Sequence, residues 1–284
     1  MSDDALEQTR RSWNHATRNH NAHKGDRAAL LAAGLELLYP EELDLLGDLE
    51  GVDLVHLQCN AGQDTLCLAR RGATATGVDF ADEAVTFARE LSTGSGIPAT
   101  FVQAEVQSWM EQTDQRFDVA FTSYGTTGWL RDIARWGRGV HRILRPGGRL
   151  VYVEFHPVSW SVAPEPPFGL TGDDYFAEEP FLEPVGDYVA ESIDGKGLGA
   201  IELGETTENT IPATSWQHGM AQVLQAVIDA GLALERIEEW PYSNGYRAKS
   251  GLVLVGDRRF GWPEGTARIP LMYGLSARRP RTRG

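Results

Sequence analysis

The chain has 284 residues, of which 42% are hydrophobic and 23% are charged, and its formal net charge is −14. This composition is that of an ordinary globular protein, and the length is enough for one large α/β domain or two small ones. No run approaches the ~20 apolar residues that span a bilayer, and the polar, acidic start lacks the pattern of a signal peptide. We therefore expect a cytoplasmic protein without a membrane span.

Charge and cysteine content narrow the classes of partner. The excess of acidic residues disfavours nucleic acid, because polyanion binding depends on cationic patches. Only Cys59 and Cys67 occur, which excludes a disulfide framework, and two thiols without a histidine cluster make a poor zinc site. We expect no metal, and a small molecule as the ligand.

The N-terminal segment, residues 6–49, has a helical pattern and predicts a helical cap over residues 1–50. Within it, residues 12–24 are too polar for a core helix. They form either a surface segment or a helix that folds over a site and presents polar side chains inward.

From residue 53 onward, short apolar runs alternate with helical stretches, which predicts a mainly parallel sheet with right-handed crossovers. The expected domain covers residues 51–284. Strands are predicted at residues 53–58, 74–78, 99–103, 117–122 and 149–155. Helices are predicted at residues 63–71, from an N-cap at Asp82 to about residue 91, and at residues 131–144.

After the fifth strand, residues 157–214 are rich in Pro, Gly and acidic residues, with aromatic residues among them. Long irregular segments of this kind are often lids, so we expect a lid insertion with short strands, for example around residue 189. A helix over residues 216–230 and strands at 232–240 and 270–278 follow. An apolar run at residues 252–255 competes for the place of the last strand.

The turn after the first strand is the expected ligand site, because ligands of open parallel sheets bind beyond the carboxyl ends of the strands. Gln58, Asn60 and Gly62 stand in this turn, where the backbone must adopt positive φ angles that Gly tolerates freely and Asn tolerates well. Asp79 ends the second strand and has two interpretations, a carboxylate that accepts ribose hydroxyls or a helix-capping residue.

Four further residues complete the expected cofactor contacts. Phe80 follows Asp79, and Ser123 follows the fourth strand. Glu105 and Val106 follow the third strand, where they are placed to meet an adenine ring.

Together these residues resemble the class I methyltransferases. The resemblance covers residues 53–155 well and residues 216–280 loosely. It is carried by the turn, Asp79, Glu105, the string Phe117-Asp118-Val119-Ala120 and above all the string Leu144-Arg145-Pro146-Gly147-Gly148-Arg149-Leu150. It implies a Rossmann-like, seven-stranded α/β sheet with helices on both faces, an antiparallel last strand and S-adenosylmethionine as the methyl donor. The chain departs from the family in the first turn, where an acidic residue and two glycines are usual and His56, Gln58 and Asn60 stand here.

Methyl transfer needs alignment of the two reactants and, for a protonated nucleophile, a base. Glu154 and His156 share a face of the fifth strand by the two-residue period, so both are predicted to point at the cleft. A histidine that is merely hydrogen-bonded at the strand end is the alternative for His156. Tyr124 is the third catalytic candidate, as a residue that positions the methyl group or the acceptor, or as a packed aromatic.

The expected acceptor contacts are polar residues of the N-terminal run, aromatic residues and one arginine. They are His20, His23, Trp129, Trp160, Tyr175, Trp216, Tyr246 and Arg247. Arg247 and Lys24 would suit an anionic acceptor, and the aromatic residues are interpreted either as an acceptor pocket or as packing.

The function that these features favour is transfer of a methyl group from S-adenosylmethionine to an N, O or C atom of a small molecule, in secondary metabolism. Two alternatives use the same scaffold. A nicotinamide-dependent oxidoreductase would also use Asp79 and a glycine turn, but the G-x-G-x-x-G spacing is missing. A protein that binds S-adenosylmethionine without catalysis is the other.

Overall fold

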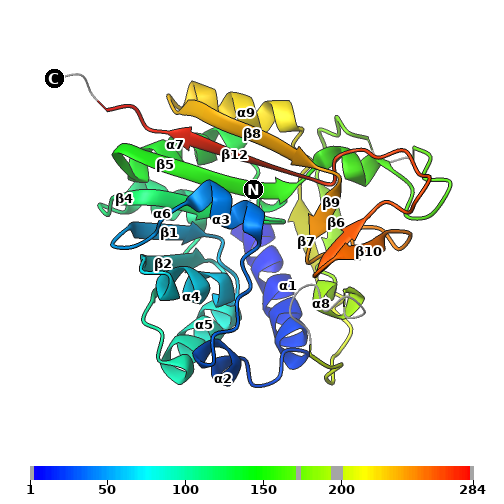
Figure 1. Ribbon diagram of the computed structural model, residues 1–284, viewed down its shortest axis with the longest axis horizontal. Helices are drawn as coiled ribbons and strands as arrows, with labels where there is room; N and C mark the ends of the chain where they lie inside the picture. Colours follow the sequence, from blue (N-terminus) through cyan, green and yellow to red (C-terminus); the bar gives the residue numbers. More distant parts are fainter. Residues whose placement is uncertain (1–2, 171–173, 193–200, 282–284) are drawn as a thin grey trace.

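A seven-stranded sheet crosses the computed structural model, which describes residues 3–170, 174–192 and 201–281 (Figure 1). Its order is β3-β2-β1-β4-β5-β12-β8, and β12 is antiparallel to both of its neighbours while the pairs among β1 to β5 are parallel. The strands are β1 (Asp53–Leu57), β2 (Thr74–Asp79), β3 (Thr100–Gln103), β4 (Phe117–Thr122), β5 (Leu144–Phe155), β8 (Ala233–Trp240) and β12 (Met272–Arg278). The predicted Rossmann-like topology with an antiparallel last strand is confirmed.

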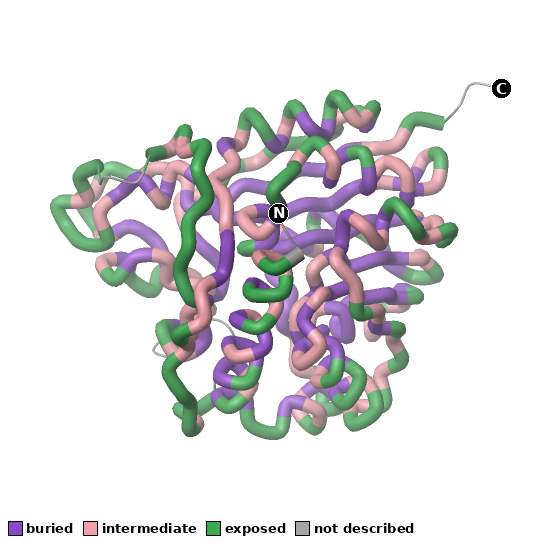
Figure 2. The backbone as a smooth tube through the Cα atoms, turned by 180° about the vertical axis from the view of Figure 1, so that it is seen from behind, coloured by how far each residue is buried: buried purple, intermediate pink, exposed green. Residues whose placement is uncertain are grey.

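Helices cover both faces of this sheet. Since successive strand residues point to opposite sides, each central strand contributes buried side chains to both faces. On one face Leu54 and Phe121 pack with α4 (Gln63–Arg70) and α5 (Asp82–Ser95). On the other, Val55 and Ala120 pack with α6 (Val106–Gln112), α7 (Ile133–Ile143) and α9 (Met220–Asp229). The central strands are accordingly buried, and exposed residues lie on the outer loops and helix surfaces (Figure 2).

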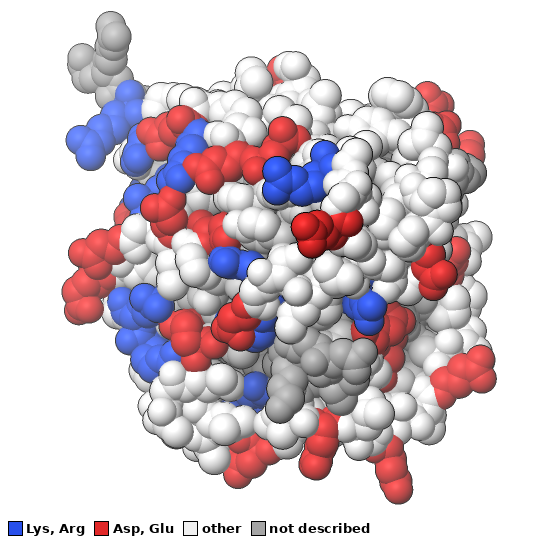
Figure 3. All heavy atoms as spheres, turned by 45° about the vertical axis from the view of Figure 1, so that its right-hand side comes forward, with Lys and Arg blue, Asp and Glu red and all other residues white. Residues whose placement is uncertain are grey.

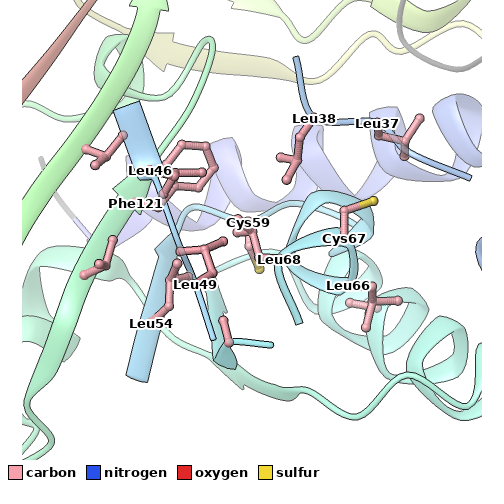
Figure 4. Packing of buried hydrophobic residues seen from close by; sticks show 14 of the residues in the cluster. Leu37, Leu38, Leu46, Leu49, Leu54, Cys59, Leu66, Cys67, Leu68 and Phe121 are labelled. Carbon is pink, nitrogen blue, oxygen red and sulfur yellow. The ribbon is translucent and has the colours of Figure 1, made fainter. Parts of the chain in front are cut away.

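The N-terminal segment is helical as predicted, with α1 (Asp3–Ala22), α2 (Arg27–Ala32) and α3 (Pro40–Leu46). Leu37, Leu38 and Leu46 of this segment pack in the same cluster as residues of β1 and α4 (Figure 4). The segment after α1 therefore shares the core of the sheet.

The lid insertion has little regular structure where it is described, and parts of it, residues 171–173 and 193–200, lie outside the described residues. It contains the 3-10 helix η2 (Pro157–Ser161), the antiparallel pair β6 (Phe181–Pro184) and β7 (Pro212–Ser215), and α8 (Tyr188–Glu191). The strand predicted around residue 189 is wrong. That segment is the short helix α8, in which the Ala190 N–H donates to the carboxylate of the N-cap residue Asp187.

Other boundaries also differ from the sequence pattern. The helix predicted from residue 216 begins at Met220, and β5 begins at Leu144 rather than residue 149. Asp82 is not an N-cap but the first helical residue of α5. Its carboxylate instead accepts hydrogen bonds from α1, from the Arg10 guanidinium and from Asn14 Nδ2.

The apolar run that competed for the last strand is β10 (Val253–Gly256) of a separate three-stranded sheet. Its partners are β11 (Arg259–Gly261) and β9 (Tyr242–Asn244), in the order β10-β11-β9. This sheet stands beside the carboxyl end of β5, near the lid insertion (Figure 1).

Charged side chains of both signs are interspersed on the molecular face in Figure 3. No helix among the described residues has the length and apolar character required to cross a membrane.

Candidate functional site

A cavity of about 660 Å³ lies at the carboxyl ends of β1, β4 and β5. Its floor is the turn after β1, and α1 and the lid insertion contribute the opposite side. This is the position at which open α/β sheets bind ligands, and the volume lies in the range of small-molecule sites.

The turn after β1 has left-handed backbone, which glycine adopts most easily, at three positions, although only one of them is a glycine. Gln58 and Asn60 have φ angles of 55° and 46°, and Gly62 has a φ angle of 72°. A Cβ atom on Gly62 would lie 2.6 Å from Ala88 Cβ and Phe101 Cε1, so no side chain fits there. Gln58 and Asn60 are accommodated because their amides turn to the backbone, Gln58 Nε2 donating to Thr126 O and Asn60 Oδ1 accepting from Ala61 N.

Asp79 joins this turn to the end of β2. Its carboxylate accepts hydrogen bonds from Asn60 N and Ala81 N, at 2.8 and 2.9 Å. Burial raises the pKa of the Asp79 carboxyl to about 6, against the effect of these hydrogen bonds. Asp79 therefore holds the first turn in place, and its contact with a ribose stays a prediction.

Glu105 also forms hydrogen bonds within the protein. It is the N-cap of α6, and its carboxylate accepts from Gln107 N and Ser108 N, each at 2.8 Å. Asp79, Phe80, Glu105 and Val106 all lie outside the cavity lining, at or just after the ends of β2 and β3. Their contacts with an adenosine group stay predictions.

His56 stands where the resemblance leads one to expect an acid. Its Nδ1 lies 2.9 Å from Thr65 Oγ1, and its Nε2 lies 3.4 Å from Ser123 Oγ. Burial lowers the pKa of His56 to about 3, so the ring is neutral at physiological pH. His56 and Ser123 thus present a neutral, hydrogen-bonding floor to the cavity.

Glu154 lines the cavity and holds the loop after β4. Its carboxylate accepts the N–H groups of Gly125, Thr126, Thr127 and Phe155. Burial raises the pKa of Glu154, and these backbone hydrogen bonds oppose the shift. Its structural role is therefore evident, while a role as base stays a prediction.

His156 lies on the same face of the sheet as Glu154, as the two-residue period predicts, but it does not line the cavity. Its Nδ1 accepts from Val158 N, and its Nε2 lies 3.0 Å from Glu239 Oε1 of β8. Burial lowers the pKa of His156 although the neighbouring Glu239 carboxylate raises it. Since Glu154 and Glu239 both pair with Tyr273 of β12, the imidazole reaches across β12 to β8 on the face of the sheet that carries Glu154.

A continuous set of aromatic rings lines one side of the cavity, and we call it the aromatic wall. Neighbouring rings have centroids 5.1 to 6.5 Å apart, at T-shaped or tilted angles. In order of contact the wall comprises Trp129, Trp13, His20, Tyr188, Tyr246, Phe155 with Trp160 beside it, Tyr124 and Tyr39. Of the predicted acceptor residues, His20, Trp129, Trp160, Tyr246 and also Trp216 line the cavity.

The other three predicted acceptor residues lie outside the lining and have structural partners. His23 pairs with Asp187 at 2.8 Å, and Tyr175 accepts a hydrogen bond from Met220 N at the start of α9. The guanidinium of Arg247 donates to the carbonyls of Leu252 and Ser250.

The polar side chains of α1 point inward, as predicted for a helix that folds over a site and not for a surface segment. Thr9, Ser12 and Asn19 are buried and hydrogen-bonded to the insertion, at Thr214 N, Val185 N and Thr207 O respectively. His20 Nε2 lies 2.9 Å from Gly186 O, and burial lowers the pKa of this ring to about 4. The insertion is thus attached to α1 mainly through polar contacts, which we call the α1–insertion seam.

Sequence reasoning missed several lining residues. Glu42, Tyr39 and Arg258 line the cavity together with Asn244 and Asp64. Glu42 is a buried residue of α3, and Arg258 stacks on the Tyr39 ring with a centroid distance of 4.3 Å. Local patterns could not reveal these residues, because they come from the cap, α4 and the small sheet and meet only in the folded chain.

Residues 55–152 match the model of a family described as a methyltransferase domain. The chain is 32% identical over 139 residues to an uncharacterised methyltransferase of Synechocystis, covering 47% of this chain and 61% of that protein. It is 30% identical over 160 residues to a demethylmenaquinone methyltransferase of Thermus thermophilus, covering 54% of this chain and 68% of that protein. A ubiquinone biosynthesis O-methyltransferase of Alkalilimnicola ehrlichii is 28% identical over 163 residues, covering 54% of this chain and 64% of that protein. The chain thus spans about two thirds of the length of these relatives.

Solved structures share the fold at low sequence identity. A complex of DhpI with SAH has a TM-score of 0.54 and 15% identity, covering 100% of both chains. An S-adenosylmethionine-dependent methyltransferase from Mesorhizobium loti has a TM-score of 0.52 and 20% identity, covering 87% of this chain and 100% of that one. The [4+2]-cyclase SpnF has a TM-score of 0.51 and 14% identity, covering 85% of this chain and 80% of that one.

Proposed function

Because the chain belongs to the class I S-adenosylmethionine-dependent methyltransferases, we propose that it transfers the methyl group of S-adenosylmethionine to a small molecule held in the cavity. The observation that carries this proposal is that one continuous cavity joins the first turn to the lid insertion. A donor bound over the turn would share this space with an acceptor under the lid.

The donor side of the cavity fits S-adenosylmethionine. The left-handed backbone at Gln58, Asn60 and Gly62 leaves the turn open to a close ligand, and Gly62 allows no side chain. Asp79, at the end of β2, would accept the ribose hydroxyls, as acids at this position do in nucleotide-binding folds. S-adenosylmethionine supplies an electrophilic methyl group on a positively charged sulfur. The chain's residues have to align the acceptor with it and exclude water.

The acceptor side is built mainly by the insertion, α1 and the loops after β4 and β5. The α1–insertion seam fixes the lid over the cavity, and the aromatic wall provides an apolar surface for a small ligand. Relatives named as a demethylmenaquinone methyltransferase and as a ubiquinone biosynthesis O-methyltransferase support a small-molecule acceptor. More specifically, we propose that the acceptor is a compound of secondary metabolism.

The fold alone does not establish methyl transfer, since a [4+2]-cyclase has a similar structure. The test is therefore calorimetric binding of S-adenosylmethionine, followed by chromatographic detection of S-adenosylhomocysteine formed with a panel of small acceptors. Binding with turnover supports the proposal, and binding without turnover across the panel supports the non-catalytic alternative. Tighter binding of a nicotinamide dinucleotide than of S-adenosylmethionine would contradict both.

A further inference from the structure

The aromatic wall ends at a polar point inside the cavity. Tyr124 is the last ring but one, with Phe155 on one side and Tyr39 on the other, at centroid distances of 5.4 and 6.3 Å. Its phenol lies close enough to the Glu42 carboxyl to affect the pKa of that group, and both side chains line the cavity. A ligand that lies along the wall therefore meets an ionisable pair where the wall ends.

The direction of the hydrogen bonds at Tyr124 follows from its neighbours. Arg259 Nε donates to Asn244 Oδ1 at 3.2 Å, which fixes the orientation of the Asn244 amide. Asn244 Nδ2 then donates to the Tyr124 oxygen at 3.0 Å. Because this oxygen already accepts from Asn244, its own O–H is directed to the Glu42 carboxyl. One lone pair of the Tyr124 oxygen is left for a donor that enters the cavity.

Glu42 differs from an ordinary capping residue in its burial. Its Oε2 accepts from Tyr39 N at 2.7 Å, which is the role of the third helical residue in a capping box. Such residues normally face water, whereas Glu42 is 1% exposed and borders the cavity. Burial, reinforced by the Asp64 carboxyl on α4 and by Glu41 on its own helix, raises the pKa of Glu42 to about 8, and the Tyr124 hydroxyl opposes the shift. A carboxyl in this state can take up a proton near neutral pH.

We propose that the methyl acceptor is an aromatic compound with a ring hydroxyl, which lies along the aromatic wall and gives its hydroxyl proton to Glu42 through Tyr124. This inference rests on the proposed function and names its substrate class. The acceptor O–H donates to the Tyr124 oxygen while Tyr124 passes its own proton to the ionised Glu42. The acceptor oxygen forms its new bond to the methyl carbon as the bond from that carbon to sulfur breaks. The sulfonium becomes a neutral thioether, and the proton remains on Glu42.

The positive charge of the donor favours this class over a cationic amine. Burial raises the pKa of Asp64, and Lys24 and Arg258, which both line the cavity, oppose this shift, so this acid already has cationic neighbours. An ammonium group would add a further cation next to the sulfonium of the donor. A ring hydroxyl that becomes negative as it loses its proton is instead attracted to that sulfonium.

The test uses the full chain with 2-naphthol as the probe acceptor. Two probes of similar size serve as comparisons, decahydro-2-naphthol, which lacks the aromatic ring, and 2-naphthylmethylamine, which is cationic at neutral pH. We expect the protein loaded with S-adenosylhomocysteine to bind 2-naphthol at least tenfold more tightly than either comparison probe. We also expect methyl transfer from S-adenosylmethionine to 2-naphthol, with a rate that increases with pH as Glu42 ionises and reaches half of its maximum near pH 8.

Glu42→Gln keeps an oxygen that can accept from Tyr39 N but removes the proton acceptor. We expect turnover of 2-naphthol to fall by about 10²-fold or more and to lose its increase with pH, while its dissociation constant changes less than about threefold. Tyr124→Phe keeps the ring of the wall and removes the hydroxyl, and it decides the question if Glu42→Gln fails to fold. Asp44→Asn is the matched control, because Asp44 lies on the exposed side of the same helix, paired with Arg236.

Unchanged turnover and pH profile in both Glu42→Gln and Tyr124→Phe would refute the proton path. Methylation of 2-naphthylmethylamine but not of 2-naphthol, or binding of S-adenosylmethionine without binding of 2-naphthol, would refute the acceptor class. The proposed function survives both of these results. Absence of S-adenosylmethionine binding would refute the proposed function itself.

Discussion

The affinity for the donor should depend on the ionisation of Asp79. If this carboxylate accepts the ribose hydroxyls, only its ionised form accepts from both at once. Burial raises the pKa of Asp79 to about 6, so the carboxylate is mostly ionised at pH 7 and about one tenth ionised at pH 5. A ligand that binds the ionised form should therefore bind about tenfold more weakly at pH 5 than at pH 7, a loss of ~1.4 kcal/mol.

The perturbation is Asp79→Asn, which removes the titrating group and keeps its size. We expect the variant to bind S-adenosylhomocysteine ~1–3 kcal/mol more weakly at pH 7, the value of hydrogen bonds to a charged group, and to lose most of the tenfold pH effect. Isothermal calorimetry at pH 5 and 7 measures both quantities, and circular dichroism checks the fold at each pH. Other groups of the cavity titrate nearby, for example Lys24, whose pKa burial lowers to about 7. The comparison of variant with wild type isolates the part that belongs to Asp79.

Asp118→Asn is a suitable control, because Asp118 lies near the opposite end of β4 and is paired with Arg145. It should behave as the wild type at both pH values. Equal affinities of the wild type at pH 5 and 7, or an Asp79→Asn variant with undiminished affinity, would show that the carboxylate only holds the turn.

Three further predictions concern the loop anchor, the first turn and the seam. Glu154→Gln replaces an acceptor oxygen with an NH₂ group and leaves buried N–H donors unpaired, so the free energy of unfolding in urea should fall by ~1–3 kcal/mol. Unchanged stability with lost turnover would instead identify Glu154 as a base. Gly62→Ala should destabilise the fold and abolish donor binding in calorimetry. Gly96 has the same sign of φ but no atom within 4 Å of an added Cβ, so Gly96→Ala should show only the effect of backbone strain, and equal effects of the two substitutions would disprove a steric role of Gly62. His23→Ala removes the partner of Asp187, so hydrogen exchange should accelerate in residues 201–215 while donor affinity is retained, and unchanged exchange would contradict the seam's importance.

The order of the sheet could be predicted because its signals are local. Each strand is a short apolar run followed by a helix, and the chirality of crossovers leaves few arrangements of such units. The backbone of the first turn was also predictable, because Asn tolerates the left-handed region that the turn requires at Asn60.

The acceptor side could not be predicted in the same way, since its residues come together only through tertiary contacts. Glu42 looks like a capping residue in sequence, and only the packing of α3 against the loop after β4 makes it part of the cavity. His156 shows the opposite error. The two-residue period correctly places it on the face of Glu154, but on that face its ring packs against Glu239 and Tyr273 instead of lining the cavity. The segment around residue 189 has β-branched and aromatic character, yet Asp187 caps it as a helix.

The position of α1 has a thermodynamic consequence for how the two reactants bind. Asn14 and Arg18 tie this helix to Asp82 and Glu83 at the start of α5, close to the end of β2, while its buried polar residues hold the insertion. Any ligand that orders α1 from one side lowers the entropic cost of ordering it from the other. We therefore expect donor and acceptor to bind with positive cooperativity, each strengthening the affinity for the other by the same factor. A donor product that leaves first would then weaken the hold on the methylated acceptor, so that one helix couples the release of both products.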